Sequence, residues 1–594
     1  MKLSVNRNTV WCDLFVEELY RNGVRHVCIS PGSRSTPLTL AFAKHHGIKS
    51  YVIVDERSSG FFALGIAKET KSPVAIVTTS GTAVAEIYPA IIEAYYQRIP
   101  LIICTADRPP HLRKRGANQT INQVNIYKNH IRFFNDLGLP DITRNAFKNF
   151  KKKIYDGLCV ALKDNIGPIH YNFPFEKPFE PDTPTDKIDV ELLNKFSNLD
   201  FQKPKNKTRI SDSYEISRIA DLISKKEKGI ILCGYKVYDP TLVKMIDRLS
   251  HHTGYPIIAD GSSSLRFGTH TKERIINNFP AMVRSKQFIA NYSPEVIIQF
   301  GGPPTSNVVL DYFKNSKAVK IIVNKFGDKN DPSLTAKFFH KIDELEFCTP
   351  IMRLKIKRSK LWQNGFQELD KTIEREKKSF LEKAVPNFEG LIVKSLIDNL
   401  PDDCNLMVSN SLPIRDLDFF ASSINKKINL FVNRGASGID GINSTALGIA
   451  TSSKRPTILL TGDLAFFHDL NGLQISYKYK IPLIIVLINN NGGGIFESLP
   501  ISRFGKLFTE NFVTSLNLEF ANFVKAYKGE YYKAGSLNQL KEKLFNLIKV
   551  KKLTVIEIKT DSKKSKEIRD KYWQTVLNKI NPPVNVIKNR RFRI

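Results

Sequence analysis

Short apolar runs rich in β-branched residues alternate with stretches of helical spacing between residues 24 and 107. The runs predict strands at residues 24–29, 51–54, 74–77 and 101–104. The stretches between them predict helices near residues 37–45, 58–68 and 82–95. This alternation is typical of βαβ units, which build a parallel sheet covered on both faces. In such sheets, functional residues gather at the carboxyl ends of the strands.

The same pattern returns twice further along the chain. Predicted strands form a second unit near residues 229–232, 256–258, 295–299 and 319–323, and a third near 406–408, 457–460, 483–488 and 554–558. A polar stretch at 202–209 predicts a linker, and a charged helical segment at 355–383 leads into the third unit. We therefore expect an α/β protein of three doubly wound parallel-sheet domains. Their expected bounds are 1–195, 205–355 and 380–565, followed by a basic tail at 566–594 that lacks periodicity.

Length and charge bear on this picture in different ways. The chain has 594 residues, and hydrophobic cores stop growing at roughly 250–300 residues, so several domains are required. The net charge of +31 raises a nucleic-acid-binding protein as a remote alternative, since clustered Lys and Arg neutralise phosphates. The basic residues form only short, dispersed runs without interleaved aromatic residues. This favours a solvated lysine-rich surface, and we expect no nucleic-acid partner.

The cysteines and the apolar runs indicate in which cellular compartment the protein lies. The seven cysteines are scattered and never stand in a Cys-x-x-Cys spacing, which predicts reduced, buried thiols. The first fifteen residues include Lys2, Arg7 and Asp13 and so lack an apolar signal region. No segment is long enough to span a bilayer. We expect a cytoplasmic protein without membrane contact.

Two polar motifs each follow directly after a predicted buried strand. Asp463 stands in Thr-Gly-Asp-Leu, and Asn490 stands twenty-seven residues later in Asn-Asn-Asn-Gly-Gly-Gly. That interval leaves room for one βα crossover, which places the two residues at neighbouring strand ends. Together with the backbone carbonyl of Gly492 they would form a hard-oxygen set suited to Mg²⁺ holding a diphosphate. For either motif alone, a helix cap or a tight turn is the alternative.

The paired motifs resemble the thiamine diphosphate motif, a Gly-Asp followed one crossover later by paired Asn. The resemblance implies thiamine diphosphate with Mg²⁺ (or Mn²⁺) bound by Asp463, Asn490 and Gly492. It also requires a carboxylate at the aminopyrimidine ring, and Glu56 follows the strand at 51–54 where a helix begins. In the family such a glutamate hydrogen-bonds N1′ of the pyrimidine and promotes deprotonation of the thiazolium C2. Without the resemblance, electrostatic stabilisation of a helix N-terminus would explain Glu56 equally well.

Four longer motifs narrow the family. They lie at residues 30–37, at 105–110 with 116–119, at 409–416 and at 433–441. With residues 55–57 and 489–496 they closely resemble the 2-succinyl-5-enolpyruvyl-6-hydroxy-3-cyclohexene-1-carboxylate synthases of menaquinone biosynthesis. The match runs in order through the first and last units, while the middle unit matches only in general pattern. The resemblance implies three domains of the thiamine diphosphate enzyme type.

This resemblance implies a transferase that decarboxylates 2-oxoglutarate on thiamine diphosphate and adds the succinyl carbanion 1,4 to isochorismate. Both substrates are dicarboxylates, and guanidinium groups grip carboxylates bidentately. Four arginines follow predicted strands within Gly-, Pro- or Ser-rich loops: Arg34, Arg108, Arg415 and Arg434. For any one of them, a solvated loop arginine is the alternative.

The family pattern implies a role for each matching residue. Isochorismate would be bound by Ser33, Arg34, Arg108, Asn118, Gln119 and Arg434. The distal carboxylate of the succinyl group would be received by Ser411 and Arg415. The cofactor would be contacted by Ser437, Gly438, Ile439, Ile495 and Phe496, with Ile439 holding it bent and the last two keeping the site dry. Ordinary core packing is the alternative for the three apolar residues.

Some features depart from the family pattern or remain open. Ala465 stands where serine is expected after the Gly-Asp pair, and the middle-unit loop has Asn307 and Val308 where basic residues are usual. The middle unit's part in isochorismate binding therefore stays open. In the family Glu56 and Asp463 meet across subunits, so we expect a homodimer or homotetramer. A thiamine diphosphate carboligase of the acetolactate synthase type is the alternative, weakened by the lack of an evident FAD signature.

Overall fold

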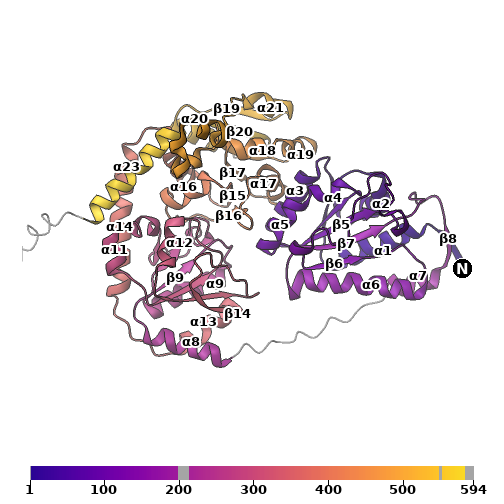
Figure 1. The fold of residues 1–594 in the computed structure, drawn as a ribbon, viewed down its shortest axis with the longest axis horizontal. Helices are drawn as coiled ribbons and strands as arrows, with labels where there is room; N and C mark the ends of the chain where they lie inside the picture. The colour runs from indigo at the N-terminus through magenta and orange to yellow at the C-terminus, as the bar shows by residue number, and fades with distance from the viewer. Residues whose placement is uncertain (1, 198–212, 548–550, 582–594) are drawn as a thin grey trace, which may run out of the picture.

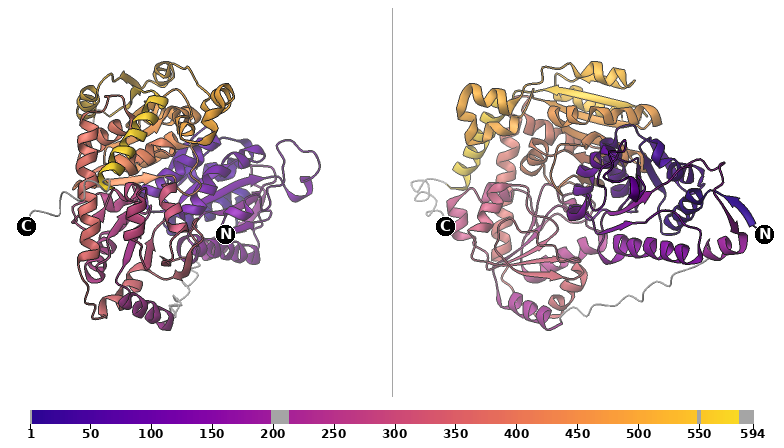
Figure 2. Two further views of the ribbon diagram at one scale, coloured as in Figure 1. Left: turned by 60° about the vertical axis from the view of Figure 1, so that its left-hand side comes forward. Right: turned by 45° about the vertical axis from the view of Figure 1, so that its right-hand side comes forward.

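The structure is a computed structural model that describes residues 2–197, 213–547 and 551–581. The described residues form three six-stranded sheets and one two-stranded ribbon. In Figure 1 the N-terminal sheet lies at the right, and the middle and C-terminal sheets are stacked at the left. The turned views of Figure 2 show the N-terminal domain seated against the other two. The three-domain α/β architecture predicted from the pattern is confirmed.

The N-terminal domain is built on the strand order β3-β2-β4-β5-β7-β6, with every pair parallel. Its strands are β2 (His26–Ile29), β3 (Lys49–Val52), β4 (Val74–Thr78), β5 (Leu101–Asp107), β6 (Phe133–Asp136) and β7 (Ile169–Pro174). Its main helices are α1 (Arg7–Arg21), α2 (Thr36–Lys44), α3 (Glu56–Thr70), α4 (Thr82–Glu86), α5 (Tyr88–Gln97) and α6 (Arg144–Cys159). The ribbon pairs β1 (Lys2–Val5) with β8 (Asp186–Asp189), which α7 (Val190–Ser197) follows.

The middle domain has the strand order β11-β10-β9-β12-β13-β14. Its strands are β9 (Gly229–Cys233), β10 (Ile257–Ala259), β11 (Ile275–Ile276), β12 (Val296–Phe300), β13 (Val319–Asn324) and β14 (Ala336–Lys341). Its helices include α8 (Ser213–Lys225), α9 (Pro240–Thr253), α10 (Phe279–Met282), α11 (Lys286–Asn291), α12 (Asn307–Lys314) and α13 (Glu344–Arg353). The predicted helical segment that leads out of this domain is α14 (Leu361–Glu382). The predicted linker at 202–209 lies outside the described residues.

The C-terminal domain has the strand order β16-β15-β17-β18-β20-β19, again all parallel. Its strands are β15 (Cys404–Val408), β16 (Ile428–Val432), β17 (Thr457–Gly462), β18 (Leu483–Asn489), β19 (Glu530–Lys533) and β20 (Leu553–Lys559). Its helices include α15 (Glu389–Asn399), α16 (Leu412–Phe420), α17 (Ile442–Ser452), α18 (Asp463–His468), α19 (Leu473–Tyr479), α20 (Gly505–Phe508), α21 (Phe520–Ala526) and α22 (Leu537–Leu547). Strands β15, β18 and β20 are almost entirely buried, as their continuous apolar runs predict.

Two predictions of local structure are wrong. The single helix expected at 82–95 is two helices, because Pro89 lacks a backbone N–H and its ring cannot follow a preceding helical turn. The expected basic tail begins instead as helix α23 (Ser562–Ile580). Its buried residues Arg569, Tyr572 and Val576 keep helical spacing, but the surrounding lysines hide that pattern in the sequence. Figure 1 shows α23 beside α14, and the Tyr572 and Phe380 rings lie 5.4 Å apart.

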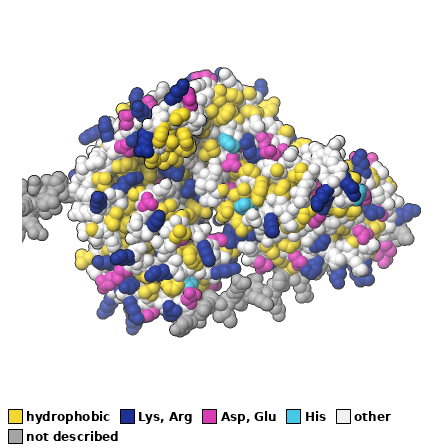
Figure 3. Space-filling model, in the orientation of Figure 1, with side chains coloured by type: hydrophobic (Ala, Val, Ile, Leu, Met, Phe, Trp, Pro, Cys, Tyr) yellow, Lys and Arg dark blue, Asp and Glu magenta, His cyan; other side chains and the backbone are white. Residues whose placement is uncertain are grey.

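The surface charges and the burial of the cysteines agree with what the composition predicts. Lys and Arg side chains are dispersed over the face seen in Figure 3 and interleaved with acidic ones. All seven cysteines lie in the described part of the chain and are free thiols, six of them buried. Within the described ranges, no helix combines the length and the apolarity needed to cross a membrane.

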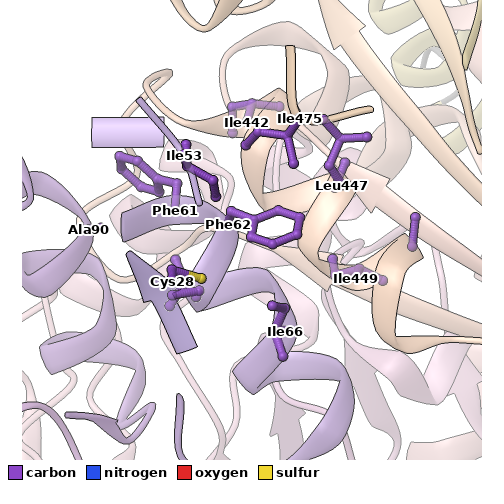
Figure 4. Close-up of a cluster of buried hydrophobic side chains, with 14 of the residues drawn as sticks. Cys28, Ile53, Phe61, Phe62, Ile66, Ala90, Ile442, Leu447, Ile449 and Ile475 are labelled. Atoms are coloured by element: carbon purple, nitrogen blue, oxygen red, sulfur yellow. The ribbon is translucent and has the colours of Figure 1, made fainter. Parts of the chain in front are cut away.

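Close packing of α3 against α17 joins the N-terminal and C-terminal domains. Figure 4 shows Phe62 and Ile66 of α3 facing Leu447 and Ile449 of α17. The backbones approach where Gly65 meets Gly448, and a Cβ built on Gly65 would lie 2.1 Å from the carbonyl oxygen of Thr445. The missing side chain allows this approach, so the relative placement of the two domains depends on it.

Replacing Gly65 by alanine should force the two helices apart. We expect Gly65→Ala to lower the free energy of unfolding by about 1–3 kcal/mol, the usual cost of overpacking a filled core. Chemical denaturation of the two proteins measures the difference. Gly535→Ala is the control, because a Cβ there meets only the side-chain oxygen of Gln539 at 3.6 Å. Equal stability of Gly65→Ala and the unaltered chain would contradict the packing argument.

Candidate functional site

The carboxyl ends of two neighbouring strands carry Asp463 and Asn490. Strands β17 and β18 pair in parallel, with Gly462 opposite Ile488, so the residues that follow them emerge at the same sheet edge. The Asp463 carboxylate accepts hydrogen bonds from the backbone N–H of Leu464 at 2.8 Å and of Gly492 at 2.7 Å. The crossover predicted between the two motifs therefore does place them side by side.

The two asparagines at this edge have different surroundings. The amide of Asn489 is used at both ends, because Nδ2 donates to Glu557 at 2.6 Å and Oδ1 accepts from Asn491 N–H at 3.0 Å. Asn490 Nδ2 donates to Glu389 Oε1 at 2.8 Å, but the buried Oδ1 of Asn490 has no partner among the described residues. A buried acceptor without a partner costs about 1–3 kcal/mol. Such an atom is suited to a ligand that the chain itself does not supply.

Gly492 is the third predicted residue at this sheet edge. Gly492 has φ of 140°, and a Cβ there would lie 2.2 Å from the carbonyl oxygen of Val513, so no other residue fits. Its N–H donates to the Asp463 carboxylate, its carbonyl accepts from Gly494 N–H at 2.9 Å, and it lines the same pocket as Asp463 and Asn490. The carboxylate, amide and carbonyl oxygens of these residues are hard donors of the kind that Mg²⁺ or Mn²⁺ prefers. Burial raises the pKa of Asp463 to about 6, which a nearby divalent cation would counteract.

A cleft opens over this edge. Seven residues predicted from the sequence line it: Ser411, Ile439, Asp463, Asn490, Gly492, Ile495 and Phe496. Glu389 and Asp416 line it as well and were not predicted. Ser411 in this lining has φ of 72° and ψ of −133°, a conformation that costs a non-glycine residue about 1–3 kcal/mol. Strain of this size persists where the surroundings impose it and is frequent at binding sites.

Two arginines stand next to the cleft. Arg415 donates to the Ser411 carbonyl at 2.7 Å, and Arg434 donates to Asn410 Oδ1 at 3.3 Å. Burial, and then the positive charge of Arg434, lower the pKa of Arg415. Two half-buried cations this close attract an anion. Asn410 also fixes the predicted Ser437–Ile439 region, because its Nδ2 donates to the Gly438 carbonyl at 2.7 Å.

A second cationic cluster lies on the N-terminal domain. Arg108 donates to Ser80 Oγ at 2.7 Å and to the Asn118 carbonyl at 2.6 Å. Burial, and then the charge of Arg108, lower the pKa of nearby Arg34 to about 10. Ser33 precedes Arg34 in a 3₁₀ turn, and the Gln119 backbone lies against Gly81. The structure thus gathers five of the predicted residues at the ends of β2, β4 and β5.

Glu56 is separate from the cleft within one chain. It is the first residue of α3, which Asp55 caps by accepting from Ser58 N–H at 3.1 Å. Burial, and then the charges of Asp55 and Glu86, raise its pKa against a backbone hydrogen bond that lowers it. Its neighbour Arg57 donates to the carbonyl of His468, at the end of α18 opposite to Asp463. In the described part of the chain, the cleft lining includes no residue of the N-terminal domain.

A contact that the sequence reasoning missed holds the loop of Arg434. The buried carboxylate of Glu93 in α5 accepts from the backbone N–H groups of Gly435 at 2.8 Å and of Ala436 at 2.7 Å. Lys68 of α3 donates to Asn433 Oδ1 at 2.6 Å on the same loop. The one local sign of this contact in the sequence is Glu93 itself, the single charged residue in the otherwise apolar stretch 87–95. The N-terminal domain therefore fixes the Arg434 loop of the C-terminal domain.

Known proteins resemble this chain along most of its length. Residues 11–126 match the model "Thiamine pyrophosphate enzyme, N-terminal TPP binding domain", and residues 423–558 match the corresponding C-terminal TPP binding domain. A 2-succinyl-5-enolpyruvyl-6-hydroxy-3-cyclohexene-1-carboxylate synthase of Bacillus cytotoxicus is 38% identical over 94% of this chain and 95% of its own length. Synthases of the same name from Oceanobacillus iheyensis and Geobacillus kaustophilus are 36% and 35% identical, over 95% and 96% of this chain and 96% and 98% of theirs.

A solved structure shares the fold. Benzoylformate decarboxylase from Polynucleobacter necessarius superimposes with a TM-score of 0.67 over 93% of this chain and 98% of its own. The sequences are only 16% identical, so this likeness concerns the architecture alone.

Loss of one charge at Glu93 should loosen the Arg434 loop. We expect Glu93→Gln to lower the free energy of unfolding by about 1.5–3 kcal/mol, because the two N–H groups bind different carboxylate oxygens and glutamine replaces one of these oxygens by an NH₂ group, which cannot accept. Hydrogen exchange at the Gly435 and Ala436 amides should become faster. Glu368→Gln is the control, since this side chain is exposed and should stay within about 0.5 kcal/mol. Unchanged protection of the two amides would refute the contact.

Proposed function

Because the chain belongs to the 2-succinyl-5-enolpyruvyl-6-hydroxy-3-cyclohexene-1-carboxylate synthase family, we propose that it decarboxylates 2-oxoglutarate on thiamine diphosphate and joins the succinyl fragment to isochorismate in menaquinone biosynthesis. Thiamine diphosphate, when bound, supplies the electron sink that stabilises the carbanion left by loss of CO₂. The observation that carries the proposal is the free, buried oxygen of Asn490 beside the Asp463 carboxylate at one sheet edge.

These two residues and the Gly492 carbonyl would hold a divalent cation, Mg²⁺ or Mn²⁺, and through it the diphosphate. Ile439 would lie beneath the bound cofactor and set its bend, while Ile495 and Phe496 would exclude water from the reacting carbon. Ser437 and Gly438 lie on the loop that Asn410 fixes and would complete the cofactor contacts. The roles of Ile439, Ile495 and Phe496 are supported by their position in the cleft, and those of Ser437 and Gly438 by the family pattern.

The two cationic clusters suit two dicarboxylate substrates. Ser411, which lines the cleft, and Arg415, which donates to the Ser411 carbonyl, would bind the distal carboxylate of 2-oxoglutarate. The cluster of Ser33, Arg34, Arg108, Asn118 and Gln119, together with Arg434, would bind isochorismate. Asn307 and Val308 start α12 and are both uncharged, so neither offers a cation for the middle domain's share.

A homodimer or a dimer of dimers would complete the site. One chain presents Glu56 and the isochorismate cluster on one domain and the cofactor cleft on another, without bringing the two together. A second copy could set its N-terminal domain over the cleft of the first, so that its Glu56 reaches the aminopyrimidine ring and moves the proton that activates C2. We place this assembly in the cytoplasm.

The proposed reaction has a direct assay. The purified protein should consume isochorismate, followed by its absorbance, when Mg²⁺, thiamine diphosphate and 2-oxoglutarate are all present. Omission of any one of the three should abolish the loss. Use of pyruvate with isochorismate left untouched would instead indicate an acetolactate-type carboligase.

Variants separate proton transfer from cofactor binding. We expect Glu56→Gln to bind thiamine diphosphate but turn over about 10²–10⁴-fold more slowly, as loss of a proton-transfer group does. Asp463→Ala should lose Mg²⁺-dependent binding of the cofactor itself, measured by calorimetric titration. Wild-type rates in either variant would remove the residue's assignment.

Mixed dimers test the shared site. If Glu56 and Asp463 of one site come from different chains, co-expressed Glu56→Gln and Asp463→Ala subunits leave one intact site in each mixed dimer. Activity should then recover to about a quarter of the wild-type value, since half of the dimers are mixed. No recovery would mean that each chain builds its site alone.

A further inference from the structure

The neighbours of Asn490 explain which way its amide faces. An asparagine amide has an oxygen at one end and an NH₂ group at the other, and only the oxygen can bind a cation. Nδ2 of Asn490 donates to Glu389 Oε1 at 2.8 Å, which leaves Oδ1 free on the cleft side. A carboxylate accepts and cannot donate, so Glu389 permits only this orientation of the amide.

Glu389 is itself held so that it cannot serve as a metal ligand. Its Oε1 also accepts from Thr560 at 3.1 Å, and its Oε2 accepts from Arg569 at 2.5 Å. The side chain is 1% exposed and stands in the first turn of α15. Both of its oxygens are therefore committed to the chain, although Glu389 lines the cleft.

Arg569 fixes this carboxylate in turn. It comes from α23, and its guanidinium also binds Asp416 bidentately, with Nε at 2.9 Å and Nη2 at 2.6 Å. Asp416 belongs to α16, the helix that starts next to Ser411. One buried cation thus spans two buried carboxylates, a geometry that a guanidinium fork satisfies and an ammonium does not.

We propose that Glu389, held by Arg569, is a positioning residue that orients the Asn490 amide so that its oxygen faces the metal. The inference rests on the proposed cofactor site and adds two residues that neither the motif nor the family models single out. Partners of this kind behind a metal ligand typically contribute about 10–100-fold in metal affinity. Helix α23 thereby becomes part of the cofactor site through Arg569.

The sharpest variant is Glu389→Gln, which keeps the shape of the side chain. The oxygen of the new amide should stay on Arg569, because a hydrogen bond to a charged group is the stronger one. Its NH₂ group would then face the NH₂ group of Asn490, and Asn490 should turn over and present nitrogen to the metal. We expect Mg²⁺-dependent thiamine diphosphate affinity, measured by calorimetry, to fall about 10–100-fold.

The effect of a second substitution, Asn490→Asp, on cofactor affinity should have opposite signs with and without Glu389→Gln. In the unaltered chain, Asn490→Asp places a carboxylate against Glu389 and should weaken cofactor binding. In the Glu389→Gln background the same change gives the new amide an acceptor and leaves the other oxygen for the metal, so it should strengthen binding. A merely structural role for Glu389 predicts the same effect of Asn490→Asp in both backgrounds, and such additivity would overturn the proposal.

Controls separate loss of fold from loss of orientation. Glu376→Gln removes an ion pair between α14 and Lys579 of α23 without touching Asn490, and should leave affinity unchanged. The unfolding temperature without cofactor reports any damage to the fold. Arg569→Lys retains the charge but not the fork, and should also weaken binding. Wild-type protein that fails to bind thiamine diphosphate with Mg²⁺ would refute the proposed function itself, whereas normal affinity in Glu389→Gln refutes only this inference.

Discussion

Parallel pairing of β17 with β18 is the constraint on which the cofactor cleft depends. The pairing fixes the register of Gly462 against Ile488, so the chain leaves both strands at one edge of the sheet. Both strands are buried among other parallel strands, and a slip by one residue would turn the apolar side chains to the wrong face. The same hydrophobic burial that stabilises the sheet therefore also sets the distance between Asp463 and Asn490.

Around that edge, polar groups are held by partners from distant parts of the chain. Glu93 of the N-terminal domain fixes the Arg434 loop, and Glu389 with Arg569 fixes the Asn490 amide. In each case a buried carboxylate accepts from donors whose loss would leave it unsatisfied, which makes the arrangement rigid. The close approach of α3 and α17 at Gly65 and Gly448 keeps the N-terminal contacts in place. The Asn490 amide and the Arg434 loop are thus both held by the chain itself.

Positive charge is distributed in two ways. The excess of basic residues is largely dispersed over the surface, whereas the arginines at strand ends are gathered into two half-buried clusters. Burial, and then the positive charge of the neighbouring arginine, lower the pKa of Arg34 and of Arg415, so an anion bound at either cluster would relieve the repulsion. The two clusters belong to different domains, and Glu56 lies on the domain that carries Arg34 and Arg108.

The sequence by itself determined the three sheets, the strand ends that carry Asp463 and Asn490, and the family to which the motifs belong. These features depend on local periodicity and on residues close together in the chain, which a pattern records directly. Only the tertiary structure decided that Asn490 and not Asn489 has a free oxygen, that α23 is a helix, and that Glu93, Glu389 and Arg569 support the site. Those outcomes depend on contacts such as Arg569 to Glu389, 180 positions apart, and no local pattern specifies which distant side chain will meet a buried polar group.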